Sequence, residues 1–438
     1  MGKRRDFIRK LTVGAAGVAI GGIVEGMSAK SYSKIIGAND RLNIAIIGLG
    51  RRYGEYIEAI SRKENNVELL YLCDVMKSRR EKALAKFGNR IDNKPILEND
   101  INKVLSDPKI DAIFNATPDH WHTPGACMAM VAGKHVYVEK PCSHNPHEAE
   151  LVVAFQRKYN KVVQMGNQYR SVPHFQEIVK EIHSGVIGNA FKAVTFYTDH
   201  RGVVPNPTKA PVPEGLDWAL FQGPAPRTEY TDLTWDYNWH WYGWTYGTAE
   251  MGNNPIHELD IARWALQVEY PEYMEVKADK RYFINDGWTM YDTMDATFKF
   301  AKNKIIKCDS QSRNGYKTYG TDRGVIVYGS EGTVYVDPDG YKVFDRNGEL
   351  KKERKIESGV DDGTSAHMLN FFNTIRGKDK LNSPIEIGAV SNMLPNYANI
   401  AYRIGKSFEI DSNTGRIFDR DAMKLWSRDY EPGWEPIL

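Results

Sequence analysis

The chain has 438 residues and a mass of 49.8 kDa, which allows two or three domains and a sizeable buried core. Hydrophobic residues make up 42% and charged residues 26%, so disordered and collagen-like chains are excluded. Four cysteines in a chain of this length predict no disulfide framework.

The net charge of +2 is unevenly distributed along the chain. Residues 1–37 hold seven lysines and arginines against two acidic residues, so the remainder is mildly acidic. A mildly acidic body lacks the basic surface that nucleic-acid binding requires. We therefore expect no nucleic-acid partner.

Residues 1–37 have the pattern of an export signal. Adjacent Arg4 and Arg5 precede an apolar stretch at 11–24, which is too short and too weakly hydrophobic for a stable membrane span. The pattern resembles a twin-arginine signal, which implies recognition by that export machinery and a periplasmic location. An amphipathic N-terminal helix is the alternative.

An apolar run at 42–48 (LNIAIIG) fits a buried parallel strand. Gly48 ends this run, and Gly50 and Gly54 follow it. Residues after Gly54 have helical spacing. Glycines between a strand and a helix let the backbone approach a pyrophosphate, and the helix N-terminus offers free N–H groups. This context predicts a dinucleotide-binding turn.

A second expected strand, residues 67–73, ends at Asp74. An acid at this position is suited to hold the ribose hydroxyls, and it disfavours the extra phosphate of NADP. We therefore expect NAD. A plain turn role for Asp74 is the alternative, and four arginines leave NADP open: Arg51, Arg52, Arg79 and Arg80.

Strand-like and helix-like segments continue to alternate, with strands expected at 112–116 and 135–138. Alternation of this kind predicts a doubly wound parallel sheet, whose ligands bind at the carboxyl ends of the strands. The residues after these two strand ends are therefore expected at the cofactor: Thr117, Pro118, His120, Trp121, His122, Glu139 and Lys140.

Lys140 is a candidate catalytic residue. A lysine at a strand end can stabilise a developing alkoxide, and one whose pKa burial has lowered can relay a proton. An ion pair with Glu139 is the alternative. His120 and His122 lack a third ligand at metal-binding spacing, so we expect no metal.

Three motifs, AIIGLGRRYG, NATPDHWH and VEKP, occur in an order that resembles the Gfo/Idh/MocA family of glucose-fructose oxidoreductase and inositol dehydrogenase. VQMGNQYRS, LDWALFQGPAP and GTAEMGNNPIHELDIARWAL extend the resemblance over most of the chain. It implies an NAD(P)-binding Rossmann domain at 38–165 and a substrate-binding and oligomerisation domain at 166–438. It also implies an exported, sugar-directed homodimer or homotetramer.

From Phe191 onward, strand-like runs alternate apolar and polar residues, which predicts an open, mostly antiparallel sheet. Helical spacing returns at 366–376 and 389–404. The expected fold class is therefore α/β plus α+β, a Rossmann domain followed by an antiparallel sheet with helices. The resemblance implies that the C-terminal helices return to pack near the first domain.

His257 opens an expected helix, and its ring could take a hydroxyl proton. Members of the resembled family typically carry an aspartate four residues earlier, where this chain has Asn253. Because asparagine cannot act as a base, Lys140 and His257 would carry the proton transfer. A cap or core role for His257 is the alternative. Asp260 and Arg263 have the spacing of a structural ion pair.

Residues 235–246 hold seven aromatics. Indole faces stack on sugars, but they also fill cores and subunit contacts. Polar residues of the GNQYR run could bind sugar hydroxyls. The candidate substrate contacts are Lys140, Asn167, Gln168, Arg170, Trp239, Trp241, Asn253 and His257.

These patterns predict an exported NAD(P)-dependent oxidoreductase that transfers hydride between nicotinamide and a hydroxyl carbon of a sugar or glycoside. An exported protein would carry its bound cofactor across the inner membrane, and the cofactor would have to be regenerated while it stays bound. One alternative is a redox-neutral glycoside hydrolase or lyase that forms a transient keto-sugar. A non-catalytic nucleotide or sugar sensor is the other.

Overall fold

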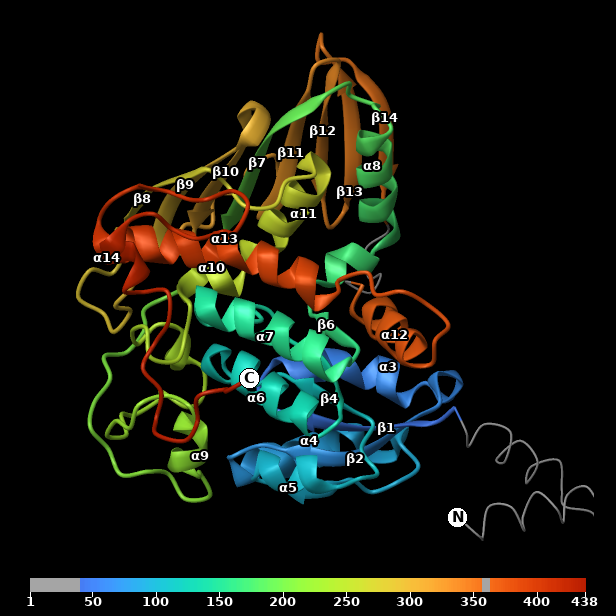
Figure 1. The fold of residues 1–438 in the computed structure, drawn as a ribbon, viewed down its shortest axis with the longest axis vertical. Coiled ribbons are helices and arrows are strands. Elements are labelled where there is room, and N and C mark those ends of the chain that lie inside the picture. The colour runs from blue at the N-terminus through green and yellow to red at the C-terminus, as the bar shows by residue number, and fades with distance from the viewer. Residues whose placement is uncertain (1–39, 357–362) are drawn as a thin grey trace, which may run out of the picture. The chain divides into compact units, whose positions relative to one another are not determined.

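The computed structural model describes residues 40–356 and 363–438, so the expected export signal at 1–37 lies outside the described residues. Leu42–Leu438 forms one compact unit, which contains two sheets (Figure 1). Within the described ranges, none of the helices is long and apolar enough to cross a membrane.

The first sheet has, in the described residues, six parallel strands in the order β3-β2-β1-β4-β5-β6. The strand order reverses between β1 and β4, and ligands of open α/β sheets bind outside the carboxyl ends at such a reversal. The strands are β1 (Leu42–Ile47), β2 (Val67–Cys73), β3 (Ile96–Glu98), β4 (Ala112–Asn115), β5 (His135–Val138) and β6 (Val163–Met165).

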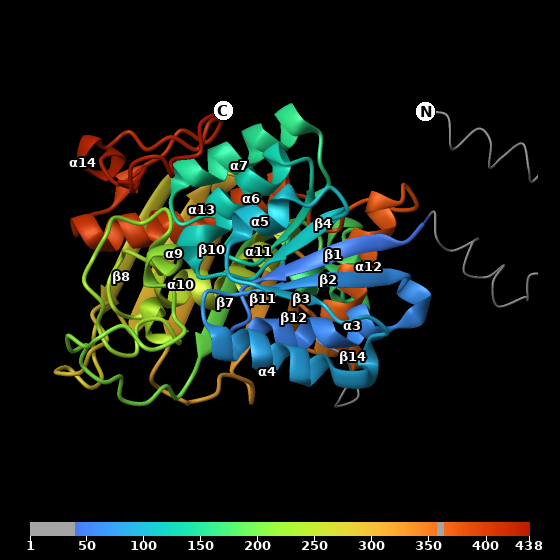
Figure 2. The ribbon, with the colours of Figure 1, turned by 90° about the horizontal axis from the view of Figure 1, so that it is seen from below.

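Helices cover both faces of this sheet (Figure 2). In β1, Ile44 and Ile46 belong to one apolar cluster, whereas Ala45 and Ile47 belong to another, as side chains that alternate along a strand require. The first cluster includes residues of α3 (Ile57–Ser61), α4 (Lys77–Phe87) and α12 (Thr364–Ile375). The second includes residues of α5 (Ile101–Ser106), α6 (Asp119–Val131) and α7 (Pro146–Tyr159).

The second sheet has, in the same described part, nine strands in the order β14-β13-β12-β11-β7-β10-β9-β8-β15. Only β7 and β10 pair in parallel, so the expectation of a mostly antiparallel sheet is confirmed. The strands are β7 (Ala190–Thr198), β8 (Tyr273–Asp279), β9 (Thr293–Phe300), β10 (Lys304–Gln311), β11 (Arg323–Gly329), β12 (Gly332–Asp337), β13 (Gly340–Asp345), β14 (Leu350–Lys355) and β15 (Phe408–Glu409).

The C-terminal helices connect the two sheets. Phe371 of α12 packs edge-on against Phe114 of β4, with ring centroids 5.7 Å apart. The long helix α13 (Ile385–Ile404) contacts both α7 and β8. The other α-helices of the described residues are α8 (Pro173–His183), α9 (Trp218–Gln222), α10 (Ala249–Asn253), α11 (Ile256–Leu266) and α14 (Arg420–Met423).

Candidate active site

A cavity of about 740 Å³ lies at the carboxyl ends of the central parallel strands. Ile47, Asp74, Thr117 and Lys140 line it from the ends of β1, β2, β4 and β5. Asp236, Tyr237, Trp239 and His240 line it from the second half of the chain. Ligand sites typically measure about 300–1,000 Å³, so the cavity is large enough for a dinucleotide end and a small substrate.

The three glycines of the turn after β1 differ in the space that each leaves for a side chain. Gly48 has φ +89°, and a Cβ there would lie 2.4 Å from the backbone oxygen of Ala116. A Cβ on Gly50 would have one close neighbour, Arg79 Nη1 at 3.9 Å, and Gly50 lines the cavity. Gly54 does not line the cavity, and its Cβ would meet the flexible end of Lys86.

This contrast predicts opposite phenotypes for two alanine variants. Gly48→Ala should lower the free energy of unfolding by about 2–5 kcal/mol, because it combines a disfavoured φ with a backbone clash. Gly50→Ala should leave stability nearly unchanged but weaken NAD binding by roughly tenfold or more, since its methyl group enters the space for the pyrophosphate. Urea denaturation and fluorescence titration with NADH measure the two effects. Equal losses of stability would contradict these assignments.

Asp74 lies in the cavity wall with its carboxylate held by the backbone. Its Oδ2 accepts the Leu49 N–H at 2.7 Å, and its Oδ1 accepts the Met76 N–H at 2.8 Å. Burial raises the pKa of Asp74, and Arg79 and these two bonds oppose that effect. Arg79 itself donates to Asp236 Oδ1 at 2.7 Å. The Asp74 carboxylate is suited to the ribose hydroxyls of NAD. Because Arg79 already pairs with Asp236, it is not free to hold the extra phosphate of NADP.

Glu139 is a buried anion at the end of β5. Its Oε1 accepts hydrogen bonds from Arg52 Nε at 2.8 Å and from the Tyr56 hydroxyl at 2.7 Å. Burial opposes its ionisation, but Arg52 and the two hydrogen bonds together hold the pKa of Glu139 below its ordinary value. Glu139 therefore fixes Arg52 at the cavity wall. Arg51, the neighbouring lining residue, lies over the Tyr237 ring at 3.8 Å.

The Lys140 ammonium donates to the backbone oxygen of Asn253 and to its Oδ1, the latter at 3.4 Å. Both residues line the cavity. Burial lowers the pKa of Lys140, and the carboxylates of Glu139 and Asp119 partly offset this effect. A lysine held in this way can donate to a substrate oxygen and can exchange a proton with it.

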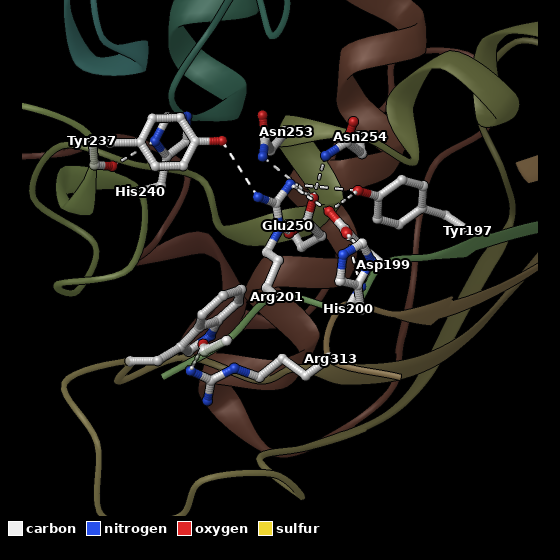
Figure 3. A network of polar contacts seen from close by, with 12 residues as sticks. Tyr197, Asp199, His200, Arg201, Tyr237, His240, Glu250, Asn253, Asn254 and Arg313 are labelled. Atoms are coloured by element: carbon white, nitrogen blue, oxygen red, sulfur yellow. Dashed lines mark hydrogen bonds and ion pairs between the residues drawn. The ribbon is translucent and has the colours of Figure 1, made fainter. Parts of the chain in front are cut away.

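A polar network lies behind Asn253 (Figure 3). The fully buried Glu250 accepts from Arg201 Nε at 2.8 Å and from Asn253 Nδ2 at 3.3 Å. It also accepts from Asn254 Nδ2. Because Glu250 takes the amide N–H of Asn253, the amide oxygen is left to face Lys140. Glu250 thereby orients the contact of Lys140 without lining the cavity itself.

We expect Glu250→Gln to change the pH dependence of the reaction. Glu250 raises the pKa of Lys140, so removing its charge should lower that pKa further. If the neutral amine accepts the substrate proton, the rise of kcat with pH should move to lower pH. Glu148→Gln is a matched control, because Glu148 is equally buried and also pairs with an arginine, Arg428, but it accepts no hydrogen bond from Asn253. An unchanged pH profile in Glu250→Gln would contradict the positioning role.

Some of the residues after β4 line the cavity, and others pack behind its lining. Thr117, Pro118, Trp121 and His122 line the cavity. The two ring nitrogens of His122 lie 2.6 Å from the Pro141 oxygen and 2.8 Å from the Thr117 oxygen. His120 does not line the cavity: its Nε2 lies 2.9 Å from the Phe221 oxygen, and burial lowers its pKa to about 3.

His257 lies in the first turn of α11 and does not line the cavity. Its ring packs 5.1 Å from that of Tyr169, and its Nδ1 lacks a hydrogen-bond partner in the described residues. Burial lowers the pKa of His257 well below its ordinary value, and the charges of Lys140 and Arg323 lower it further. The ring is therefore neutral near pH 7. Its catalytic role stays a prediction.

Three expected sugar contacts lie outside the cavity lining for identifiable reasons. Arg170 is buried and donates from Nε and Nη2 to both carboxylate oxygens of Asp260, at 2.7 and 2.8 Å. Trp241 is core: its ring stacks on Trp288, with centroids 3.8 Å apart. Gln168 is also buried away from the lining.

Asn167 is buried too, and neither polar atom of its side chain has a partner in the described residues. Trp239 does line the cavity and stacks on His240, with ring centroids 3.5 Å apart. In the described ranges no three His, Cys, Asp or Glu side chains gather as a metal site would require.

Sequence reasoning missed several lining residues that come from distant segments. Asp119 follows Pro118 within a motif already assigned to the cofactor, so its position was available from the sequence. Leu220 and Phe221 gave no separate signal. Asp236, Tyr237 and His240 belong to the aromatic run, in which the tryptophans were the residues predicted to contact a sugar.

A Rossmann sheet with a glycine turn, a strand-end acid and a cavity lysine defines an NAD-dependent oxidoreductase. Residues 42–167 match "Oxidoreductase family, NAD-binding Rossmann fold" and residues 174–435 match "Oxidoreductase family, C-terminal alpha/beta domain", both of the Gfo/Idh/MocA group. The chain belongs to the Gfo/Idh/MocA family of oxidoreductases.

The chain is similar to the D-glucoside 3-dehydrogenase of Escherichia coli K12, with 27% identity over 81% of this chain and 93% of that protein. It is 22% identical to the myo-inositol 2-dehydrogenase of Thermotoga maritima, over 68% and 75% of the two chains. The structure of a levoglucosan dehydrogenase with NADH and levoglucosan has a TM-score of 0.66 at 16% identity, covering 84% and 99%. At that identity the similarity shows the fold alone.

Proposed function

We propose that this protein oxidises a secondary hydroxyl group of a sugar or glycoside with NAD. The observation that carries the proposal is Lys140, whose ammonium lies in the wall of the cavity at the strand ends, with Asn253 as its partner. Relatives named as dehydrogenases of a glucoside and of an inositol support the choice of substrate class.

Gly48, Gly50, Arg51, Arg52 and Asp74 would hold the dinucleotide along the strand ends. When bound there, NAD would supply the hydride acceptor for the carbinol carbon of the substrate.

The chain's own groups would perform the accompanying proton transfer. Lys140, as a neutral amine, accepts the hydroxyl proton, and Asn253 holds the resulting ammonium. Trp239 and Tyr237 form an aromatic wall that suits the C–H faces of a sugar ring. Trp121, which donates from Nε1 to the Phe221 oxygen at 3.0 Å, closes the cavity towards that segment.

Incubation of the protein and NAD with 4-nitrophenyl β-D-glucopyranoside tests the reaction class. Net formation of NADH together with a keto-glycoside, detected by mass spectrometry, is the expected result. Release of 4-nitrophenol with no net NADH would favour the redox-neutral glycosidase instead. If neither product forms with this glycoside, with free glucose or with myo-inositol, and NAD still binds, the sensor alternative replaces the proposal.

We also propose that the protein is exported by the twin-arginine route and acts in the periplasm. Arg4, Arg5 and the apolar stretch at 11–24 support this proposal. Changing both arginines to lysine in the full chain should leave the protein in the cytoplasm. Unchanged secretion of that variant would count against the route. Homodimer or homotetramer formation stays a prediction for size measurement in solution.

A further inference from the structure

A second cavity of about 480 Å³ shares no lining residue with the first. It lies where the start of α7, the end of α13 and the C-terminal segment 424–429 meet. Nothing in the proposed oxidation uses this space. Its lining combines cations, amides, hydroxyl groups and one indole ring, and Asp429 is its only acidic residue within the described part of the chain.

Arg403 is a cation on the wall of this cavity. It lies in the last turn of α13, with its guanidinium 5.2 Å from the centre of the Trp244 ring. Arg403 is exposed to solvent on the cavity wall, and it forms no ion pair with a carboxylate of the described residues. A guanidinium is a planar group whose N–H donors match the two oxygens of a carboxylate, so Arg403 is free to bind an anion that enters the cavity.

Two further donors on the cavity wall lack acceptors. Asn145 caps α7 by accepting the Glu148 N–H at 3.0 Å, and its Nδ2 has no partner in the described residues although Asn145 is only 6% exposed. Arg428 donates from Nε to Glu148, while its Nη1 likewise lacks a partner there. An excess of donors at the start of a 14-residue helix favours an acceptor-rich anion.

Other lining groups favour a sugar over a bare ion. Trp244 adds a half-buried indole ring, which can contact the apolar C–H groups of a pyranose beside Arg403. Thr228 and Asn396 add a hydroxyl and an amide to the lining of this cavity. A cavity of this size also exceeds what an inorganic anion would fill.

We propose that this second cavity binds a small acidic sugar, one whose carboxylate is held by Arg403. One hydrogen bond connects the linings of the two cavities. Thr248 lines the second cavity, and its Oγ1 donates to Asp119 of the first at 2.6 Å. An acidic sugar bound here would therefore lie one hydrogen bond away from the lining of the reacting cavity.

Calorimetric titration of the folded, NAD-saturated protein with D-glucuronate tests the proposal. Saturable binding is expected, and Arg403→Met should weaken it by about tenfold or more. Arg403→Lys should weaken it less, because the charge remains while the fork is lost. Arg416→Met is the matched control: Arg416 also lies over an indole, that of Trp426 at 4.7 Å, but it pairs with Glu150 and lines neither cavity.

Each other outcome of the titration would overturn the proposal. Absence of saturable glucuronate binding would exclude the site, and equal affinity in Arg403→Met would exclude its location. Equal affinity for inorganic sulfate would show an anion site without sugar recognition, and equal affinity for glucose would remove the role of the carboxylate. None of these outcomes would affect the proposed oxidation in the first cavity.

Discussion

Replacing Lys140 with methionine should lower kcat by about 100- to 10,000-fold, the range that general acid–base groups contribute. Methionine preserves the length and apolar stem of the side chain but removes the group that donates to Asn253 and exchanges the proton. Binding of NAD should change little, because the glycine turn and Asp74 lie at other strand ends. Steady-state kinetics and NADH titration measure the two effects.

Lys134 provides a matched control for this variant. It is also a buried lysine with a pKa lowered by burial, and its Nζ donates to the backbone oxygens of Asp107 at 2.7 Å and Ile110 at 3.0 Å. It does not line the cavity. Lys134→Met should cost about 1–3 kcal/mol of stability for the unsatisfied carbonyls and leave kcat unchanged. Equal catalytic losses in both variants would contradict a special role for Lys140.

Lys140 also predicts the direction of the pH dependence. Oxidation needs the neutral amine, so kcat should rise with pH through the pKa of Lys140. Burial lowers that pKa from 10.5, so the midpoint should lie below 10.5. The rise should be absent from the residual activity of Lys140→Met. A wild-type profile that falls over this range would contradict the amine as proton acceptor.

Arg170→Met should destabilise the protein by about 3–5 kcal/mol, because it leaves the Asp260 carboxylate buried without its partner. The exposed fractions of the two side chains are 4% and 1%, so water cannot replace the lost contact. The folded fraction should retain a nearly unchanged KM, since Arg170 does not line the cavity. Chemical denaturation and activity per folded molecule separate these effects.

The double variant Arg170→Met/Asp260→Asn keeps this prediction testable if the single variant fails to fold. It removes both charges of the pair, while the amide can still bond to Ser391. Much of the lost stability should return, because a buried pair costs desolvation that a neutral pair avoids. A KM that rises strongly in the stable double variant would instead assign Arg170 to the substrate.

Local patterns were sufficient to predict the parallel sheet and the strand ends of the cavity. The apolar run of β1, the glycines after it and Asp74 after β2 are each encoded within a few residues, and a parallel sheet necessarily brings its carboxyl ends to one edge. The same reasoning predicts Thr117, Glu139 and Lys140 at the cofactor, and all three line the cavity.

Partners distant in sequence could not be predicted in this way. Spacing suggested Arg263 for Asp260, but Asp260 pairs with Arg170, which is 90 residues away. Trp239 and Trp241 are two residues apart in one aromatic run, yet one lines the cavity and the other stacks on Trp288. Composition alone cannot distinguish them, because the run is irregular and its tertiary packing decides which ring is buried.

The most direct test of the account is a single-turnover transfer of deuterium. The purified protein is mixed with one equivalent of NAD and with glucose or a glucoside deuterated at every ring carbon, and the nucleotide is then analysed by mass spectrometry. The account predicts one deuterium per reduced nucleotide in the wild-type protein, and a rate of deuterium transfer about 100- to 10,000-fold lower with Lys140→Met. Bound nucleotide that acquires no deuterium from any sugar, inositol or glycoside would contradict it.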